Sequence, residues 1–294
     1  MRYSRQKIVF MLFAAAALMA ISACTGDEGP AGPQGPAGPV KPSVYGLVVR
    51  DNYEAYYQRY EVIDCQTLVN VSYVPSVPYV YVNGEELSMN TEGMIYSSGF
   101  TYLSGLFLDM GDDATLRVDY RKNGDDKSAG ATVAVPDTFS LLSSPGPLFI
   151  SEAGSISMEW ESAGGAEKYW LVAAYSGSYE DNSGNTIEFQ RDFTTVVMDT
   201  TYTLQGADIF PDRDDIDRYT SFGGRVYIYA VTGPFGYGDE YNITGDAVGM
   251  FRGVTECARN VRFVKLIPLA GENSPPEIKE PDIFDLMSRL MPAR

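Results

Sequence analysis

The stretch Ser155-Ile156-Ser157-Met158-Glu159-Trp160 decides the fold class. Polar and apolar residues alternate along it, so Ile156, Met158 and Trp160 would share one face of a β-strand. Further runs rich in Val, Tyr and Thr lie on both sides of it along the chain, with turn residues between them. Apolar residues at helical spacing are scarce before the last dozen residues. The sequence therefore predicts an all-β protein.

The runs around this stretch predict one domain over residues 138–268. A linker of 136–147 leads into it, and strands are expected at 155–160, 167–175, 200–204 and 224–231. The order of Trp160, Tyr169, Leu204 and Tyr229-Ala230-Val231 resembles that of a fibronectin type III domain. The resemblance implies an antiparallel, seven-stranded β-sandwich used for spacing and binding and rarely for catalysis. The connection 207–223 departs from the family because it is longer.

Residues 43–137 predict a preceding antiparallel β-sandwich, immunoglobulin-like in its strand spacing. Strands are expected at 44–49, 68–74, 79–82, 105–108, 115–120 and 131–135. Asn83-Gly84 and Asn123-Gly124 are typical of tight hairpin turns. Between the first two strands lie four tyrosines: Tyr53, Tyr56, Tyr57 and Tyr60. They either form a contact surface for a protein or glycan ligand or are ordinary sheet and surface residues.

A basic and apolar leader begins the chain. Arg2, Arg5 and Lys7 precede an apolar run of 8–21, which is shorter than the roughly 20 residues of a membrane span. This pattern is typical of a signal peptide, here residues 1–23. Ile21-Ser22-Ala23-Cys24 resembles the lipobox of bacterial lipoproteins. The resemblance implies that Cys24 carries palmitate-like acyl chains that anchor the protein; the alternative is an ordinary signal in which Cys24 is incidental.

The residues after Cys24 indicate a location. Thr25 rather than Asp follows the cysteine, which resembles outer-membrane sorting in Gram-negative bacteria, and Asp27-Glu28 resembles a surface-export signal. The expected location is therefore the cell envelope, lipid-anchored, at the outer membrane or cell surface of a Gram-negative bacterium.

A collagen-like repeat forms the tether, residues 24–42. Five triplets begin with Gly between Gly26 and Val40, and four of them continue with Pro. Gly at every third position is the collagen pattern. Two alternatives stay open: a stiff spacer of roughly 3.1 Å per residue, or a short triple helix that would make the protein a trimer.

Charge and composition exclude several classes of function. The net charge is −17, or about −20 without the leader, so nucleic acid and anionic lipid are poor partners. The chain has no His, which removes Ser-His-Asp and Cys-His catalysis and the commonest zinc ligand. Carboxylate pairs remain available for glycoside hydrolysis. No catalytic pattern is recognisable, so we expect a protein that is not an enzyme and has no cofactor.

Two further groups of residues are candidates for covalent or metal chemistry. Cys65 and Cys257 form either one disulfide, in an oxidising compartment, or two buried thiols. Asp212, Asp214, Asp215 and Asp217 are weak calcium candidates, since their order lacks the alternation and the Gly of an EF-hand loop. A solvated acidic loop is the expected alternative.

Residues 269–294 predict a Pro- and Glu-rich linker followed by a short amphipathic helix. Pro281 suits a first helical position. Ile283, Phe284, Leu286, Met287, Leu290 and Met291 fall on one face at helical spacing. This stripe either folds back on the body or docks on a partner, through Phe284, Met287, Leu290 and Met291.

The expected function is a non-catalytic lipoprotein of the cell envelope. It would act as a binding or adhesion module at the bacterial surface, held to the membrane by its lipid and contacting a protein or glycan. The alternative is a structural subunit of an envelope assembly that docks through its C-terminal helix.

Overall fold

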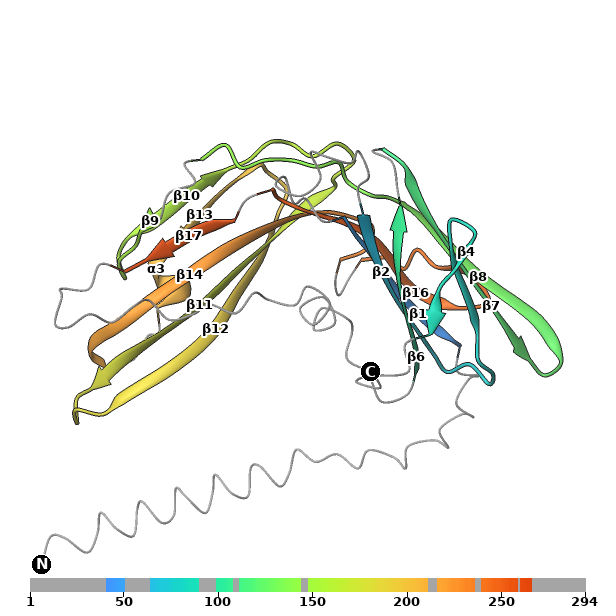
Figure 1. Ribbon diagram of the computed structural model, residues 1–294, viewed down its shortest axis with the longest axis horizontal. Coiled ribbons are helices and arrows are strands. Elements are labelled where there is room, and N and C mark those ends of the chain that lie inside the picture. The colour runs from blue at the N-terminus through green and yellow to red at the C-terminus, as the bar shows by residue number, and fades with distance from the viewer. Residues whose placement is uncertain are drawn as a thin grey trace, which may run out of the picture. The chain divides into compact units, whose positions relative to one another are not determined.

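Strands make up nearly all regular structure in the computed structural model, which describes residues 41–50, 64–89, 99–107, 111–143, 148–210, 216–235, 239–258 and 260–265. These residues contain seventeen strands and one four-residue helix, α3 (Gly206–Ile209) (Figure 1). The described residues belong to one compact unit that begins at Lys41. The prediction of an all-β protein is confirmed.

Ten of the strands form one large sheet. Along its main path the order is β12 (Thr186–Val197), β11 (Lys168–Asp181), β14 (Ile216–Thr232), β16 (Val248–Glu256), β1 (Ser43–Arg50), β2 (Asp64–Ser72), β6 (Gly99–Phe107) and β5 (Ser88–Met89). Beside this path β17 (Val261–Val264) pairs with β14 and with β9 (Leu148–Phe149).

Two smaller sheets complete the strands. One has five strands in the order β15 (Thr244–Gly245), β8 (Asp125–Ala134), β7 (Asp113–Lys122), β3 (Tyr79–Val82) and β4 (Glu85–Glu86). The other is the pair β10 (Ser155–Glu159) and β13 (Thr201–Gln205). Asn83-Gly84 and Asn123-Gly124 both have the positive φ angles that tight hairpins require, which confirms these two turns.

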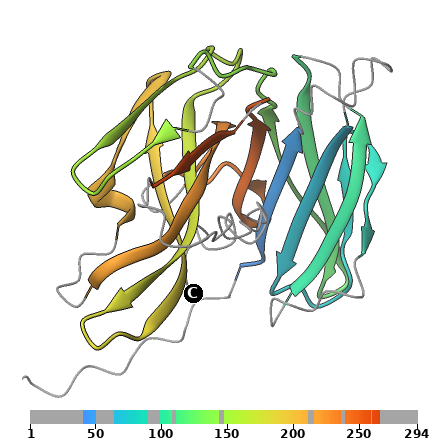
Figure 2. The same cartoon turned by 60° about the vertical axis from the view of Figure 1, so that its left-hand side comes forward.

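A parallel pairing joins the two halves of the sequence. β1 and β16 run side by side from Ser43 opposite Val248 to Arg50 opposite Thr255, as Figure 2 shows for the blue and orange-red strands. β1 lies in the predicted first domain and β16 in the predicted second. One hydrogen-bonded sheet therefore crosses the expected boundary at residues 137 and 138, and the division into two sandwiches stays a prediction.

A first core lies between the large sheet and the β10–β13 pair. Ile156, Met158 and Trp160 are 1–3% exposed, which confirms the face predicted from their alternation. The rings of Trp160 and Tyr169 meet edge to face, with centroids 5.4 Å apart. Leu204 and Ala230 also belong to this core, whereas Tyr229 and Val231 lie on the opposite face of β14.

A second core lies between the large sheet and the five-stranded sheet. It joins two sets of side chains, from β1, β2 and β16 on one side and from β3 and β7 on the other: Val44, Val48, Val69, Val71 and Phe251 against Val80, Val82, Leu116, Val118 and Tyr120. Register places both cores on the same face of the large sheet. Ala230, which belongs to the first core, pairs with Thr255 of β16. Thr255 pairs in turn with Arg50 of β1, and Arg50 lies on the same side of β1 as Val48, a residue of the second core.

The prediction of a long connection over 207–223 is wrong at its end. β14 already begins at Ile216, so eight of these residues form a strand. The reason is aromatic packing. Tyr219 and Phe222 are buried, and their ring centroids lie 5.4 Å and 4.2 Å from that of Phe210. Burial of these rings stabilises the extension of β14 beyond what its polar neighbours indicate.

Candidate binding surface

β7 carries a strict alternation between the second core and solvent. Ala114, Leu116, Val118 and Tyr120 are buried, while Thr115, Arg117 and Arg121 are exposed and Asp119 is half-buried. β7 pairs with β3 on one side and β8 on the other. Because directly paired residues point to the same side of a sheet, the outward residues of the three strands form one surface. We call this surface, with the adjoining Ser76 and Val77, the β7 face.

Three rows of paired side chains cross the β7 face. In the first, the guanidinium carbon of Arg117 lies 4.3 Å from the centroid of the Tyr81 ring. In the second, Tyr79 is opposite Asp119, which accepts a hydrogen bond of 2.8 Å from the Ser128 hydroxyl. In the third, Arg121 Nε donates to Asp126 Oδ1 at 2.9 Å. These rows place an aromatic ring beside fixed charges.

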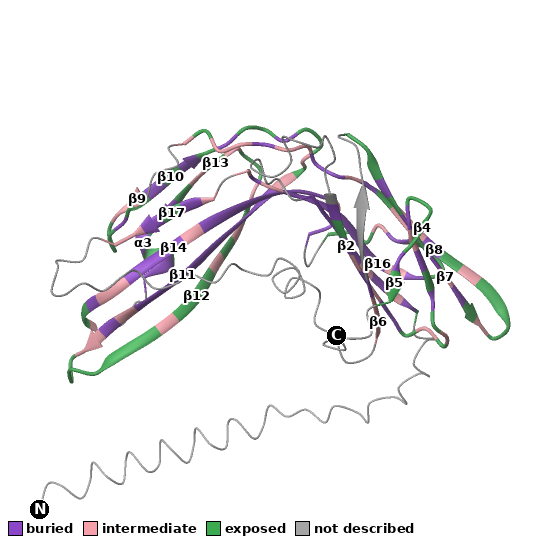
Figure 3. Ribbon diagram, in the orientation of Figure 1, coloured by how far each residue is buried: buried purple, intermediate pink, exposed green. Residues whose placement is uncertain are grey.

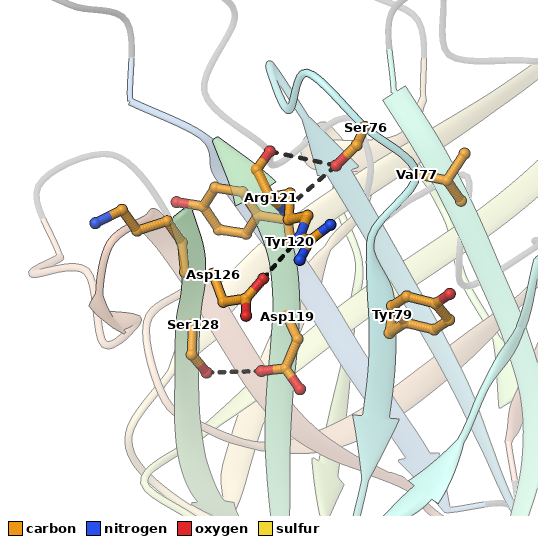
Figure 4. A pocket seen from close by; sticks show the side chains of 9 residues that line it. Ser76, Val77, Tyr79, Asp119, Tyr120, Arg121, Asp126 and Ser128 are labelled. Carbon is orange, nitrogen blue, oxygen red and sulfur yellow. Dashed lines mark hydrogen bonds and ion pairs between the residues drawn. The ribbon is translucent and has the colours of Figure 1, made fainter. Parts of the chain in front are cut away.

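An open cavity of about 650 Å³ lies over the second and third of these rows (Figure 4). Tyr79 is 59% exposed and the neighbouring Val77 is 56% exposed. Ser76 fixes this edge of the cavity, because its hydroxyl donates to the Arg121 carbonyl and accepts from the Arg121 N–H, both at 3.3 Å. The exposed ring is thus held beside a rim of hydroxyl, guanidinium and carboxylate groups.

The side chains of the β7 face suit binding. A phenol ring offers a flat apolar surface with a polar tip, and hydroxyl, carboxylate and guanidinium groups around it supply hydrogen bonds that orient a ligand. Beneath the surface, Tyr120 is buried and donates a hydrogen bond of 2.9 Å to the Asp246 carbonyl. Burial and the Asp246 charge raise the pKa of Tyr120, so its hydroxyl stays protonated and keeps this contact.

A second cavity of about 500 Å³ lies where β8 meets the chain after β14. Its polar groups serve the local backbone. Glu167 accepts a hydrogen bond of 3.1 Å from the Gly233 N–H, and Asn242 forms two hydrogen bonds of 2.8 Å with the Phe251 backbone. Lys168 Nζ contacts Asp239 at 3.3 Å. We interpret this cavity as a structural feature of the fold, because its polar side chains bond to neighbouring parts of the protein itself.

Most of the site residues predicted from sequence lie outside the described residues. This holds for Cys24, for Tyr53, Tyr56, Tyr57 and Tyr60, for Phe284, Met287, Leu290 and Met291, and for Asp212, Asp214 and Asp215. Asp217, the remaining calcium candidate, is an exposed residue of β14. Within the described ranges, no three His, Cys, Asp or Glu side chains are grouped as a metal site.

Cys65 and Cys257 lie in different cores. Arg50 is paired with Cys65 on one side and with Thr255 on the other, so Cys65 and Thr255 are two strand spacings, about 10 Å, apart. Cys257 follows two residues after Thr255. A disulfide needs Cα atoms within about 7 Å. The structure therefore holds both cysteines as buried thiols, which is the alternative to the predicted bridge.

The β7 face itself was missed by sequence reasoning, which singled out the tyrosines of 51–61 instead. A signal was present in the alternation of Thr115, Arg117, Asp119 and Arg121. That alternation shows that β7 has a solvent face, but only the pairing with β3 places Tyr79 and Tyr81 beside its charges.

No helix in the described ranges is long and apolar enough to span a membrane. Comparisons with protein-family models and with curated proteins found no match to this sequence.

Proposed function

We propose that the protein is a non-catalytic lipoprotein of the bacterial cell envelope that binds a protein or glycan through its β7 face. Lipid on Cys24 anchors it, and the Gly-Pro repeat holds the body away from the membrane. The body consists of an immunoglobulin-like and a fibronectin type III-like sandwich and ends in a short helix. Adhesion or ligand capture at the cell surface is the role that this arrangement serves.

One observation carries the binding role: Tyr79 is 59% exposed on a face where neighbouring side chains are hydrogen-bonded to one another. Large apolar or aromatic side chains at ordered, partly hollow surfaces are typical of binding sites. The fixed partners also matter, because a preorganised surface loses less conformational entropy when a ligand binds. The absence of His from the sequence is consistent with a role that needs no proton transfer near neutral pH.

Replacing Tyr79 by alanine is expected to weaken ligand binding about tenfold, or about 1.4 kcal/mol, while leaving the fold unchanged. The probes are an array of glycans and a panel of immobilised host and envelope proteins, tested with the mature chain carrying Cys24→Ser for solubility. Arg121→Ala should weaken binding by a similar factor. Tyr241→Ala is the matched control, since Tyr241 is 50% exposed and lies outside the β7 face. An equal loss of affinity in Tyr241→Ala, or an affinity that Tyr79→Ala leaves unchanged, would contradict the assignment of the β7 face as the binding surface.

The location is tested on intact cells. Protease added outside is expected to remove the body beyond Val40, because a surface lipoprotein presents its domains to the medium. The control is the same treatment after the outer membrane has been permeabilised, with a periplasmic protein as marker. A body that is cleaved only after permeabilisation would face the periplasm, and the assembly-subunit alternative would replace the adhesion role.

A further inference from the structure

A third apolar cluster lies on the face of the large sheet opposite the two cores. It contains Leu47 and Val49 of β1, Trp170, Val172 and Ala174 of β11, Tyr227, Tyr229 and Val231 of β14, Val254 of β16, and Phe235. Alternation separates the faces: on β14, Ile228 and Ala230 belong to the first core, whereas Tyr227, Tyr229 and Val231 point the other way. We call this cluster the rear face.

The side chains of the rear face are as little exposed to solvent as those of the two cores. Its ten members are 0–7% exposed, and Val172, Val231 and Val254 are at 0%. In Figure 3 much of β11 and β14 is coloured as buried. Side chains on one face of a sheet stay wet unless another layer packs against them. Within the described residues, the cluster has one member beyond the four strands, Phe235, whose ring centroid lies 5.6 Å from that of Trp170. A face buried to this extent needs a covering layer, of which Phe235 is the described apolar part.

The C-terminal segment has the sequence and the length for this role. It follows Lys265 directly after β17, whose Val264 pairs with Gly223 of β14. From Gly223 to Tyr229 the distance along β14 is about 20 Å at roughly 3.3 Å per residue. The linker 266–280 spans up to about 50 Å when extended. Beyond it, Ile283, Phe284, Leu286, Met287, Leu290 and Met291 form an apolar stripe at helical spacing.

Charge favours the same occupant. Arg225 of β14 and Arg262 of β17 are directly paired, and alternation places both on the side of Tyr227. The linker carries Glu272, Glu277 and Glu280 in the stretch that leaves β17. An acidic linker that crosses this edge of the sheet would bring its carboxylates near these two guanidinium groups.

We infer that the C-terminal segment folds back onto its own sheet, with the stripe of residues 283–291 covering the rear face as a short amphipathic helix. The large sheet is then covered on both sides, by the smaller sheets on one face and by the chain's own tail on the other. This inference goes beyond the proposed function. It also assigns to the tail an intramolecular contact in place of docking on a partner.

The two tryptophans of the chain make this testable, because each reports one face of the sheet. Trp170 belongs to the rear face and Trp160 to the first core, and both are 1% exposed. Trp160→Phe leaves Trp170 as the only emitter, and Trp170→Phe leaves Trp160. Acrylamide quenching is measured in each background on the mature chain in detergent micelles, with an intact tail and with Phe284→Ser, Met287→Ser and Leu290→Ser combined.

Breaking the stripe is expected to raise the quenching constant of Trp170 at least threefold and to leave that of Trp160 unchanged. The matched control combines Asp285→Ser, Ser288→Ala and Arg289→Ser on the opposite side of the predicted helix, and it should change neither constant. Strong quenching of Trp170 with the tail intact would overturn the inference. A Trp170 that stays protected from acrylamide when the stripe is broken would also overturn it. If the protection of Trp170 depended on protein concentration, a second copy of the chain would cover the rear face instead.

A rise in the quenching of Trp160 would show that the stripe variant has lost its fold. In that case a cross-linking measurement on the folded protein tests whether the tail contacts the rear face. Benzoylphenylalanine replaces Phe284 in one sample and Arg289 in the control. Irradiation is expected to join position 284 to peptides that contain Trp170, Tyr227–Val231 or Leu47–Val49 of the same molecule. Adducts only to another molecule, or to none of these strands, would overturn the fold-back.

Discussion

Replacing Gly249 by alanine is expected to lower the free energy of unfolding by at least about 3 kcal/mol. Gly249 has a φ of +146°, a region that side-chain-bearing residues adopt at a cost of about 1–3 kcal/mol. A Cβ atom there would also overlap the carbonyl oxygen of Val44, directly across the β1–β16 pairing. Backbone atoms of a central strand have little room to move, so the overlap adds to the conformational cost.

Gly124→Ala is the matched control for this substitution. Gly124 also has a positive φ, +89°, but a Cβ atom there meets nothing within 4 Å. Its replacement should therefore cost only the conformational strain, about 1 kcal/mol. Urea denaturation followed by circular dichroism gives both values. Equal costs for the two variants would contradict the close approach of β1 and β16.

The consequence of Gly249→Ala reaches beyond its own strand. The β1–β16 pairing is the place where the large sheet passes from one half of the sequence to the other, and Val44 and Phe251 beside it belong to the second core. We expect a single unfolding transition in the native protein and a broader or divided transition in the variant, since the substitution weakens the joint between two parts that each retain a core.

Local elements were predictable where one face is apolar and the other polar. Ile156, Met158 and Trp160 show this, as do the strand Tyr79–Val82 and the Asn83-Gly84 turn that follows it. In each case the information lies within a few neighbouring residues, because period-two alternation and left-handed turn residues act locally. The prediction of strand type therefore needed no knowledge of partners.

The joint between the halves had no such local signal. β16 is buried on both faces, so its sequence lacks alternation, and Gly249 and Gly253 interrupt its apolar residues. Its partner β1 lies about 200 residues earlier in the chain, and which strands pair depends on the whole fold. The β7 face was unpredictable for the same reason, because its tyrosines and its charges come from different strands.

The rear face shows how a sequence pattern gains meaning from the structure. The stripe of residues 283–291 fits equally well with folding back or with docking on a partner when only its spacing is known. A buried apolar face whose hydrophobic cluster has one described member from outside its four strands, Phe235, provides a surface that suits such a stripe. The two arginines paired at its edge, Arg225 and Arg262, favour the acidic segment that leads to the stripe.

Raising the pH from 10 to 12 is expected to lower the free energy of unfolding by about 2 kcal/mol or more. Burial, assisted by Glu86, raises the pKa of Tyr102 to about 12, and burial, assisted by Glu152, does the same for Tyr219. Through most of this window the unfolded chain has lost these phenolic protons and the folded chain retains them. Stability therefore falls as pH rises, by about 2 kcal/mol for each tyrosine between pH 10 and 12, out of about 2.7 kcal/mol over the whole titration.

Arg252 acts in the opposite direction over the same window. Burial lowers its pKa to about 10, so above this pH the unfolded chain binds one proton more than the folded chain, and stability rises with pH. This offsets about the contribution of one tyrosine. Burial also raises the pKa values of Tyr120, Tyr175 and Tyr202, each of which adds to the loss. The tyrosines outnumber the arginine, so the net effect is a loss of stability.

Tyr219→Phe and Tyr102→Phe separate these contributions. Each variant should flatten the fall in stability between pH 10 and 12 by about 2 kcal/mol, measured by urea denaturation at several pH values. Tyr102→Phe also loses the hydrogen bond that the phenol donates to the Pro78 carbonyl. That loss is present below pH 10 as well, so the slope of stability against pH is the diagnostic quantity. Variants whose curves ran parallel to that of the native chain would show that these phenols titrate alike in the folded and unfolded states, and the cores around them would then be open to water.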